Sequence, residues 1–180
     1  MSKQETGKMQ YTLFDTAWGQ ALIAWSGKGV CRFILPGLSK AKMMAELRRD
    51  CPGAKPGEDE QIAKVITQVQ DYFAGEVIEF KASLDLSWAS PFQAAVYRAL
   101  RQVRYGETTS YGELAKAAGR PGAGRAVGQA NAENRIPLLI PCHRVLRADG
   151  ELGGFSGPGG RKMKALLLVH EKPRQFSCGP

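Results

Sequence analysis

Three short runs rich in apolar and β-branched residues lie within the first 35 positions, and they predict β-strands. Strand-like runs cover residues 10–16, 20–26 and 30–35, where successive side chains would point to opposite faces of a sheet. Glycine-containing turns separate the runs at residues 18–19 and 27–29. Because short turns of this kind join antiparallel neighbours, we expect a three-stranded meander.

Apolar residues at helical spacing follow these strand-like runs further along the chain. Residues 39–49 predict a short helix, and residues 58–74 carry an apolar stripe at intervals of three and four, which is typical of an amphipathic helix. Gly75 follows and is a common helix terminator. Residues 77–86 predict an extended segment. These elements together predict an α/β N-terminal domain of antiparallel strands plus helices over residues 1–86.

The remaining residues, 87–180, predict a mostly α-helical second domain. Ser90 and Pro91 form a helix start, because serine caps free backbone amides and proline suits the first helical position. A last helix is expected over residues 161–170.

Two shorter helices in this domain are joined by a tight turn. Ser110 and Glu113 match a capping box that would open the first helix, which ends before Gly119. Residues 123–133 predict the second. This is the outline of a helix-turn-helix. Many helix pairs share the outline without touching DNA, so it does not assign a function alone.

The second helix of this pair is rich in small residues. Because glycine costs a helix up to about 1 kcal/mol relative to alanine, several in one helix need a reason. They would allow either close packing against the first helix or a flat surface that a DNA backbone can approach. Arg125 is the long side chain on this patch; it is either a solvated arginine or a DNA contact. The small residues are Gly122, Ala123, Gly124, Ala126, Gly128 and Ala130.

The charge balance favours the DNA interpretation. The formal net charge is +8 and the isoelectric point is about 9.5, and basic residues outnumber acidic ones between Arg98 and Arg147. A basic domain attracts polyanions, of which nucleic acid is the most common, although many basic proteins bind none. No apolar run approaches the roughly 18 residues of a membrane span. We expect no membrane partner and a cytoplasmic location, or a nuclear one in a eukaryote.

The number and spacing of the cysteines and histidines do not fit a structural zinc site. None of Cys31, Cys51, Cys142 and Cys178 stands in a Cys-x-x-Cys pair, and the chain has 2 histidines. Structural zinc usually needs four well-spaced Cys or His ligands, so we expect no metal. Cys31 and Cys51 are interpreted as packed thiols, since free cysteine is often simply buried.

Cys142 differs from the other cysteines in its sequence surroundings. An apolar run over residues 136–141 leads into it, and two prolines predict that the run is extended and places the thiol accurately. His143 and Arg144 follow. A base or a positive charge beside a thiol promotes the thiolate, which is the nucleophile. A Cys-His hydrolase is one alternative, with His170 as the second histidine; an accidental Cys-His pair is another.

This segment resembles a known active site. Asn134, Ile136-Pro137 and the run from Ile140 to Val145 are together similar to the active-site segment of the O6-alkylguanine-DNA alkyltransferases, also called methylated-DNA–protein-cysteine methyltransferases. The resemblance covers most of residues 90–172. It includes residues 109–111, 124–128, 153–157 and 167–171, whereas the first 86 residues are similar only in their strand-rich α/β character.

The resemblance implies repair of double-stranded DNA by irreversible transfer of an alkyl group from O6-alkylguanine to Cys142. It leaves O4-alkylthymine open as a minor substrate. His143 would act as the base through a water molecule, Glu171 would orient this histidine, and Asn134 would brace the turn before Cys142. The reaction would need no cofactor, and each molecule would act once.

The resemblance also implies how DNA is held. Tyr111 would hydrogen-bond the guanine and push its 3′ phosphate, while Arg125 would enter the base stack from the minor groove and fill the gap left by the flipped nucleotide. Flipping costs a few kcal/mol, and inserted side chains help to supply it. The helix surface around Arg125 would contribute Ala123, Ala126 and Gly128.

A third implied set surrounds the alkylated base. Pro137 and Phe155 would wall the pocket, and Ser156 would stabilise the leaving guanine. The backbone carbonyls of Cys142 and Val145 would receive the exocyclic amine, and Arg144 is counted among the substrate- and DNA-binding residues. The family commonly has tyrosine where this chain has Phe155, which keeps a stacking face and loses a hydroxyl.

One further alternative is a binder of damaged DNA that performs no chemistry. Alkyltransferase-like proteins of this type lack the cysteine, so the presence of Cys142 favours transfer. We expect a monomer, and leave open whether it binds DNA cooperatively.

Overall fold

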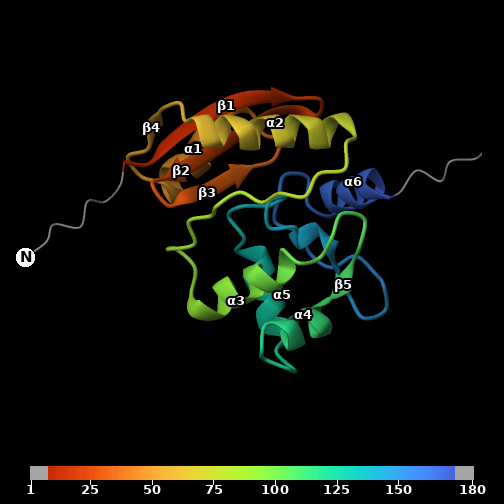
Figure 1. The fold of residues 1–180 in the computed structure, drawn as a ribbon. Helices are drawn as coiled ribbons and strands as arrows, with labels where there is room; N and C mark the ends of the chain where they lie inside the picture. Colours follow the sequence, from red (N-terminus) through yellow and green to blue (C-terminus); the bar gives the residue numbers. More distant parts are fainter. Residues whose placement is uncertain (1–7, 173–180) are drawn as a thin grey trace, which may run out of the picture.

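A computed structural model describes residues 8–172 of the chain. The predicted meander is confirmed: three antiparallel strands form most of one sheet, and a short fourth strand lies parallel to the first. Figure 1 shows this sheet above a group of helices, with α6 between the two parts. The sheet order is β3-β2-β1-β4, with β1 at Gln10–Thr16, β2 at Gly19–Ser26, β3 at Gly29–Ile34 and β4 at Lys55–Pro56.

Both faces of the central strand β2 are covered. Leu22 and Ala24 point into an apolar cluster with Met43 of α1 (Lys40–Asp50). The alternate residues of β2 point the other way, toward α2 (Glu60–Ala74) and the rest of the molecule. Asp59 caps α2 by accepting hydrogen bonds from two backbone amides, and Gly75 ends it with a φ of 105°. Residues 21–25, a continuous apolar run, are therefore all buried.

The extended segment expected over residues 77–86 is largely wrong. Only Leu84 pairs with the edge of β3, through an isolated bridge to Val30. The carbonyls of Phe80 and Ala82 instead accept hydrogen bonds from the Arg101 side chain, at 3.3 and 2.9 Å. Because a side chain takes these carbonyls, no neighbouring strand pairs with them, and the segment crosses to the next helix as a loop.

The helices of the second half begin where the capping signals place them. Ser90 opens α3 and Ser110 opens α4, each through a reciprocal capping box, with Gln93 and Glu113 respectively. A tight turn separates α4 from α5, as expected. The elements are α3 at Pro91–Leu100, β5 at Thr109–Ser110, α4 at Tyr111–Ala117, α5 at Gly124–Ala132, η1 at Cys142–Arg144, β6 at Val145–Leu146 and α6 at Arg161–Glu171.

One apolar cluster joins the two predicted domains. It runs from the inner face of the sheet through α2 to α3, α4 and α5, and includes the residues just before Cys142. The division at residue 86 stays a prediction, but the shared cluster means that the first half forms part of the environment of the second.

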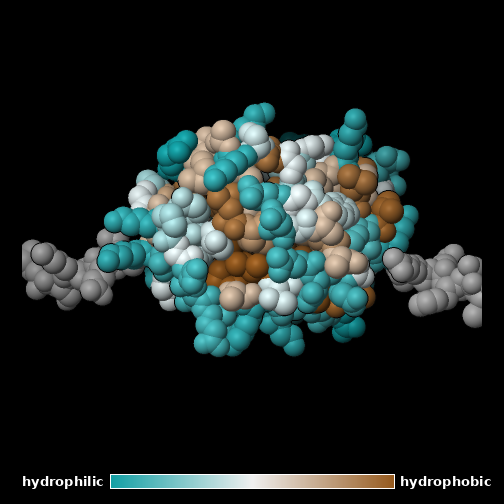
Figure 2. Space-filling view, turned by 90° about the horizontal axis from the view of Figure 1, so that it is seen from above, coloured by the Kyte–Doolittle hydropathy of each residue, from teal (hydrophilic) through white to brown (hydrophobic). Residues whose placement is uncertain are grey.

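The outer face of the sheet region is mixed in character. Figure 2, seen from above this region, shows hydrophilic residues around separate apolar patches. Of the helices in residues 8–172, none combines the length and the apolar character that crossing a bilayer would need.

Candidate active site

The segment before Cys142 is a buried turn, and the expected extended run over residues 136–141 is wrong. Pro137 bridges to Ile140, and the Ile140 amide donates to the Ile136 carbonyl at 2.9 Å. Leu138 sits at the top of the turn with a φ of 73°. The Asn134 side chain closes the turn by donating to the Ile140 carbonyl at 2.9 Å and accepting from the Ile136 amide at 3.0 Å. The two prolines thus flank a bend, after which Cys142 begins η1.

Glu171, on the last turn of α6, is the centre of a buried polar cluster. Its carboxylate is 2.7 Å from His143 Nε2 and accepts from Arg144 Nε at 2.8 Å and Nη2 at 2.9 Å. The Tyr72 hydroxyl donates to it at 2.8 Å and the Gly106 amide at 3.3 Å. Burial alone would raise the pKa of Glu171, but the hydrogen bonds from His143 and Arg144 hold it far below its ordinary value. The carboxylate is therefore ionised.

His143 is held as a neutral imidazole with a defined tautomer. Burial lowers the pKa of His143 from 6.5, and the nearby Glu171 offsets this only in part. Because the ionised carboxylate accepts from Nε2, the proton of the neutral ring sits on Nε2, and Nδ1 carries the free lone pair. Nδ1 is buried and makes no hydrogen bond to the described residues. His143 can therefore accept a proton at Nδ1.

The Cys142 thiol is almost wholly buried, with 5% of its surface exposed. Burial raises the pKa of Cys142, and a hydrogen bond from Asn134 and the positive charge of Lys164 act against this rise. Lys164 is itself fully buried and donates to the Val145 carbonyl at 2.6 Å. Deprotonation of Cys142 thus depends on specific neighbours, because water does not stabilise the thiolate here.

A cleft of about 430 Å³ opens beside Cys142. Pro137, Phe155 and Ser156 line it on the catalytic side, and residues of β3 and α1 line the opposite side. Gly157 is tightly packed, since a Cβ there would lie 2.4 Å from the Phe155 ring. The structure therefore brings the expected pocket residues together around the thiol.

The carbonyls of Cys142 and Val145 each already accept one hydrogen bond, from the Val145 amide and from Lys164 respectively. A carbonyl has two lone pairs, so each keeps one acceptor site. Arg144 does not reach the surface expected for DNA. Its guanidinium is buried against Glu171 and donates to the Val103 carbonyl at 2.7 Å, so it orders the site from inside.

The α4–α5 pair separates the two explanations for its small residues. Gly124 and Gly128 face Tyr111, where an added Cβ would make ordinary contact at 3.8 Å. Arg125 and Ala126 are exposed, and Ala123 is half-buried at the start of α5. The Tyr111 hydroxyl lies against Gly153, because a Cβ on Gly153 would approach it to 2.2 Å. Close packing therefore does not require glycine at these two positions, while the outer face of α5 is open.

His170 does not meet the requirement of a Cys-His hydrolase. Its Nε2 lies 2.6 Å from the Tyr72 carbonyl, and its ring packs against Trp18 and Tyr72. It is therefore engaged with the Tyr72 backbone and two aromatic rings, while His143 holds the polar contact to Glu171.

Comparison with known proteins agrees with this geometry. Residues 91–173 match the family model described as 6-O-methylguanine DNA methyltransferase, DNA binding domain. The constitutive methylated-DNA–protein-cysteine methyltransferase of Bacillus subtilis is 35% identical over 162 residues, which cover 90% of this chain and 94% of that protein. This chain belongs to the methylated-DNA–protein-cysteine methyltransferase family. A Mycobacterium tuberculosis O6-methylguanine methyltransferase structure is 37% identical, with a TM-score of 0.74 over 94% of this chain and 96% of that one. The same bacterium's OGT, solved in complex with DNA, is 38% identical with a TM-score of 0.73 over 91% and 92% of the two chains.

Within this methyltransferase, three buried residues escaped the sequence analysis. Lys164 could have been found, because it lies three and seven positions before Leu167 and Glu171 on the inward face of α6. Tyr72 belongs to the apolar stripe of α2, and nothing local marks its contact with a residue 99 positions away. Arg32 sits on a strand whose neighbours are apolar, and no sequence signal connects it to the turn before Cys142.

Proposed function

We propose that this chain repairs double-stranded DNA by moving an alkyl group from guanine O6 onto its own Cys142. The observation that carries the proposal is a buried thiol beside a cleft, followed directly by a neutral histidine whose Nε2 contacts the ionised Glu171. O4-alkylthymine remains a candidate minor substrate.

The proposed chemistry uses only groups of this chain and the DNA. A water molecule relays the Cys142 proton to His143 Nδ1, and Glu171 stabilises the imidazolium that forms. The sulfur attacks the alkyl carbon, the bond from that carbon to O6 breaks, and its electron pair leaves with the guanine. The thiol proton ends on the released guanine. The product is a stable thioether, so each molecule reacts once.

The α4–α5 pair would act as a helix-turn-helix on the minor groove. Arg125 is exposed on α5, and the neighbouring Ala123, Ala126 and Gly128 let a DNA backbone come close. Arg125 would occupy the gap left by the flipped guanine. Tyr111 packs against Gly128 of this helix, and its hydroxyl lies against Gly153. It would hydrogen-bond the base that enters the cleft.

The cleft residues would hold the flipped base. Pro137 and Phe155 would pack against the alkyl group and the ring, Ser156 would stabilise the departing guanine, and the free lone pairs at Cys142 and Val145 would accept the exocyclic amine. We assign Arg144 to positioning Glu171, in line with its burial. A monomeric state and a cytoplasmic location stay predictions.

The test is the mass of the intact protein after incubation with a duplex containing O6-methylguanine. We expect a gain of one methyl group per chain, mapped to the Cys142 peptide, and Cys142→Ser should bind the duplex without gaining mass. Cys31 and Cys51 are internal controls, since both are buried thiols outside the site. A label on either, or turnover beyond one equivalent, would contradict the proposal.

A further inference from the structure

One residue of the sheet reaches the turn that holds Cys142. Arg32, on β3, is only 7% exposed. Its Nη1 donates to the backbone carbonyl of Arg135 at 2.8 Å and to its neighbour Phe33's carbonyl at 3.0 Å. Arg135 directly follows Asn134, so a side chain from the N-terminal half contacts the segment that positions the nucleophile.

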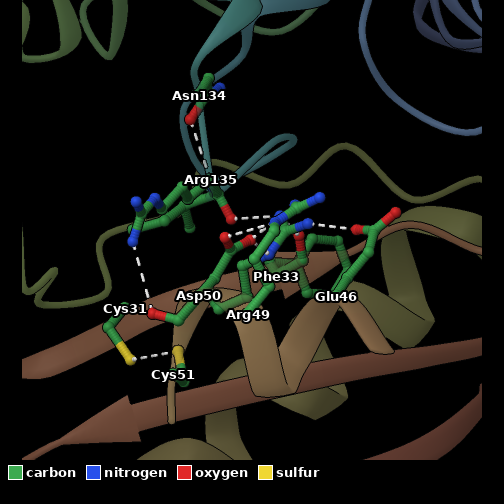
Figure 3. Close-up of polar contacts among 10 residues, drawn as sticks. Cys31, Phe33, Glu46, Arg49, Asp50, Cys51, Asn134 and Arg135 are labelled. Carbon is green, nitrogen blue, oxygen red and sulfur yellow. Dashed lines mark hydrogen bonds and ion pairs between the residues drawn. The ribbon is translucent and has the colours of Figure 1, made fainter. Parts of the chain in front are cut away.

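Two carboxylates of α1 hold this guanidinium in place. Arg32 Nη2 binds Glu46, and Nε lies 3.0 Å from the Asp50 carboxylate, an ion pair in which the N–H does not point straight at the oxygen. Figure 3 shows the Glu46 and Asp50 side chains of α1 and the Arg135 carbonyl converging on one point. Burial lowers the pKa of Arg32, while Asp50 and Glu46 act in the opposite direction. A buried arginine with this set of partners has little freedom to move.

The contact continues through a single peptide group. The Arg135 carbonyl accepts from Arg32 and also from the Phe33 amide at 2.9 Å. The N–H of the same peptide group, that of Ile136, donates to Asn134 Oδ1 at 3.0 Å. Two donors from β3 thus fix the orientation of this peptide group. Because its N–H points at the Asn134 side chain, the end of that side chain which faces it must be the oxygen, Oδ1.

The orientation of Asn134 matters for Cys142. With Oδ1 facing Ile136, Nδ2 faces the other way and donates to the Ile140 carbonyl at 2.9 Å. The Cys142 amide donates to that same carbonyl at 2.8 Å. If the 135–136 peptide rotated, the Asn134 amide would lose its acceptor role and could turn its oxygen toward the thiol, where a donor is needed to stabilise a thiolate.

We propose that Arg32 is a positioning residue for alkyl transfer, acting through the 135–136 peptide and Asn134 on the Cys142 thiol. The inference rests on the proposed function and gives the N-terminal half a defined part in it. Arg32 does not touch the reacting atoms, so its loss should slow transfer without weakening the binding of DNA.

The experiment compares Arg32→Met with Arg48→Met in single-turnover reactions on a saturating duplex that carries O6-methylguanine. Arg48 is the matched control, because it is an arginine of α1 that is exposed and does not line the cleft beside Cys142. For Arg32→Met we expect a transfer rate about tenfold lower at pH 7, a pH profile moved to higher pH, and an unchanged Kd for the duplex. Arg48→Met should stay within about twofold of wild type, since exposed substitutions away from the site change little.

The pH profile separates positioning from a general loss of structure. The other titratable groups around Cys142 are His143, Lys164 of α6, Tyr97 of α3 and Tyr111 of α4, and all stay in both variants. Arg32→Lys keeps the positive charge beside Glu46 and Asp50 but cannot bind them and two carbonyls at once. If Arg32→Met fails to fold, Arg32→Lys should fold and still show the slower transfer and the shifted profile.

Two results would overturn the inference: a folded Arg32→Lys with the rate and pH profile of wild type, or equal losses in Arg32→Met and Arg48→Met. A wild-type protein that gains no mass on Cys142 would instead refute the proposed function itself. The two failures are therefore distinguishable.

Discussion

The Glu171 cluster and the outer face of α5 place charged side chains under opposite conditions. At Glu171, two oxygens accept five contacts, four of them from buried side chains. On α5, Arg125 stands exposed among small residues. A buried charge must have its partners inside the protein, since an unpaired one costs several kcal/mol. An exposed charge is solvated by water, so it needs no partner until DNA binds. The comparison shows why chemistry and DNA contact are built on different elements.

The largest expected effect comes from breaking the Glu171 cluster. Glu171→Gln leaves Arg144 with a buried, uncompensated charge, so we expect the free energy of unfolding to fall by about 3 kcal/mol. Transfer should slow by about 100-fold, because the imidazolium loses its partner. Denaturant unfolding and single-turnover kinetics measure the two effects. Glu60→Gln, which removes an exposed pair with Lys64, should change neither by a measurable amount.

Removing the exposed charge on the outer face of α5 should leave the free energy of unfolding unchanged. Arg125→Ala should lower the transfer rate on duplex DNA by about 100-fold, comparable to losing a few kcal/mol of flipping energy. It should react nearly normally with the free base O6-benzylguanine, which needs no flipping. Arg120→Ala, in the exposed turn before α5, is the control and should mainly reduce the salt dependence of binding. Equal losses on both substrates would show that Arg125 does not act by filling the gap left by the flipped nucleotide.

The smallest effect is a pH dependence of stability confined to the buried cluster. Because the pKa of His143 is lowered by burial, the unfolded chain binds a proton before the folded one does. Stability should therefore fall below pH 6.5, by up to about 1.4 kcal/mol for each pH unit. Glu171 has the depressed pKa of a paired carboxylate, so its contribution persists until the pH drops below about 4.5 and is then lost. Unfolding curves of His143→Gln should lack the first phase; an unchanged curve would refute the assignment.

The same contrast explains what the sequence could predict. Local signals placed the helices well, because the Ser90 and Ser110 capping boxes and the α2 stripe act within one or two turns of the chain. The 136–141 run and the 77–86 segment were wrong, because an apolar or alternating pattern does not reveal that Asn134 or Arg101 takes the backbone groups. Tyr72, Lys164 and Arg32 were missed for a related reason: each acts through a contact with a distant part of the chain.

The resemblance identified Cys142, His143, Glu171 and Asn134, and the structure brings these four together. It could not supply Tyr72 and Arg32, since both come from the half of the chain where the resemblance is loose. The roles of Tyr111, Arg125, Phe155 and Ser156 stay predictions until DNA is bound.

The position of Glu171 on the last turn of α6 has a consequence for dynamics. A carboxylate at the negative end of a helix opposes the helix dipole, and helix ends open more readily than helix centres. Opening of that turn would carry Glu171 away from His143, so the catalytic arrangement exists only while one helical turn stays closed. Exchange of the α6 amides with deuterated water should therefore track the fraction of molecules ready to react. The hydrogen bonds that Arg144 and Tyr72 donate to Glu171 would stabilise the closed form of that turn.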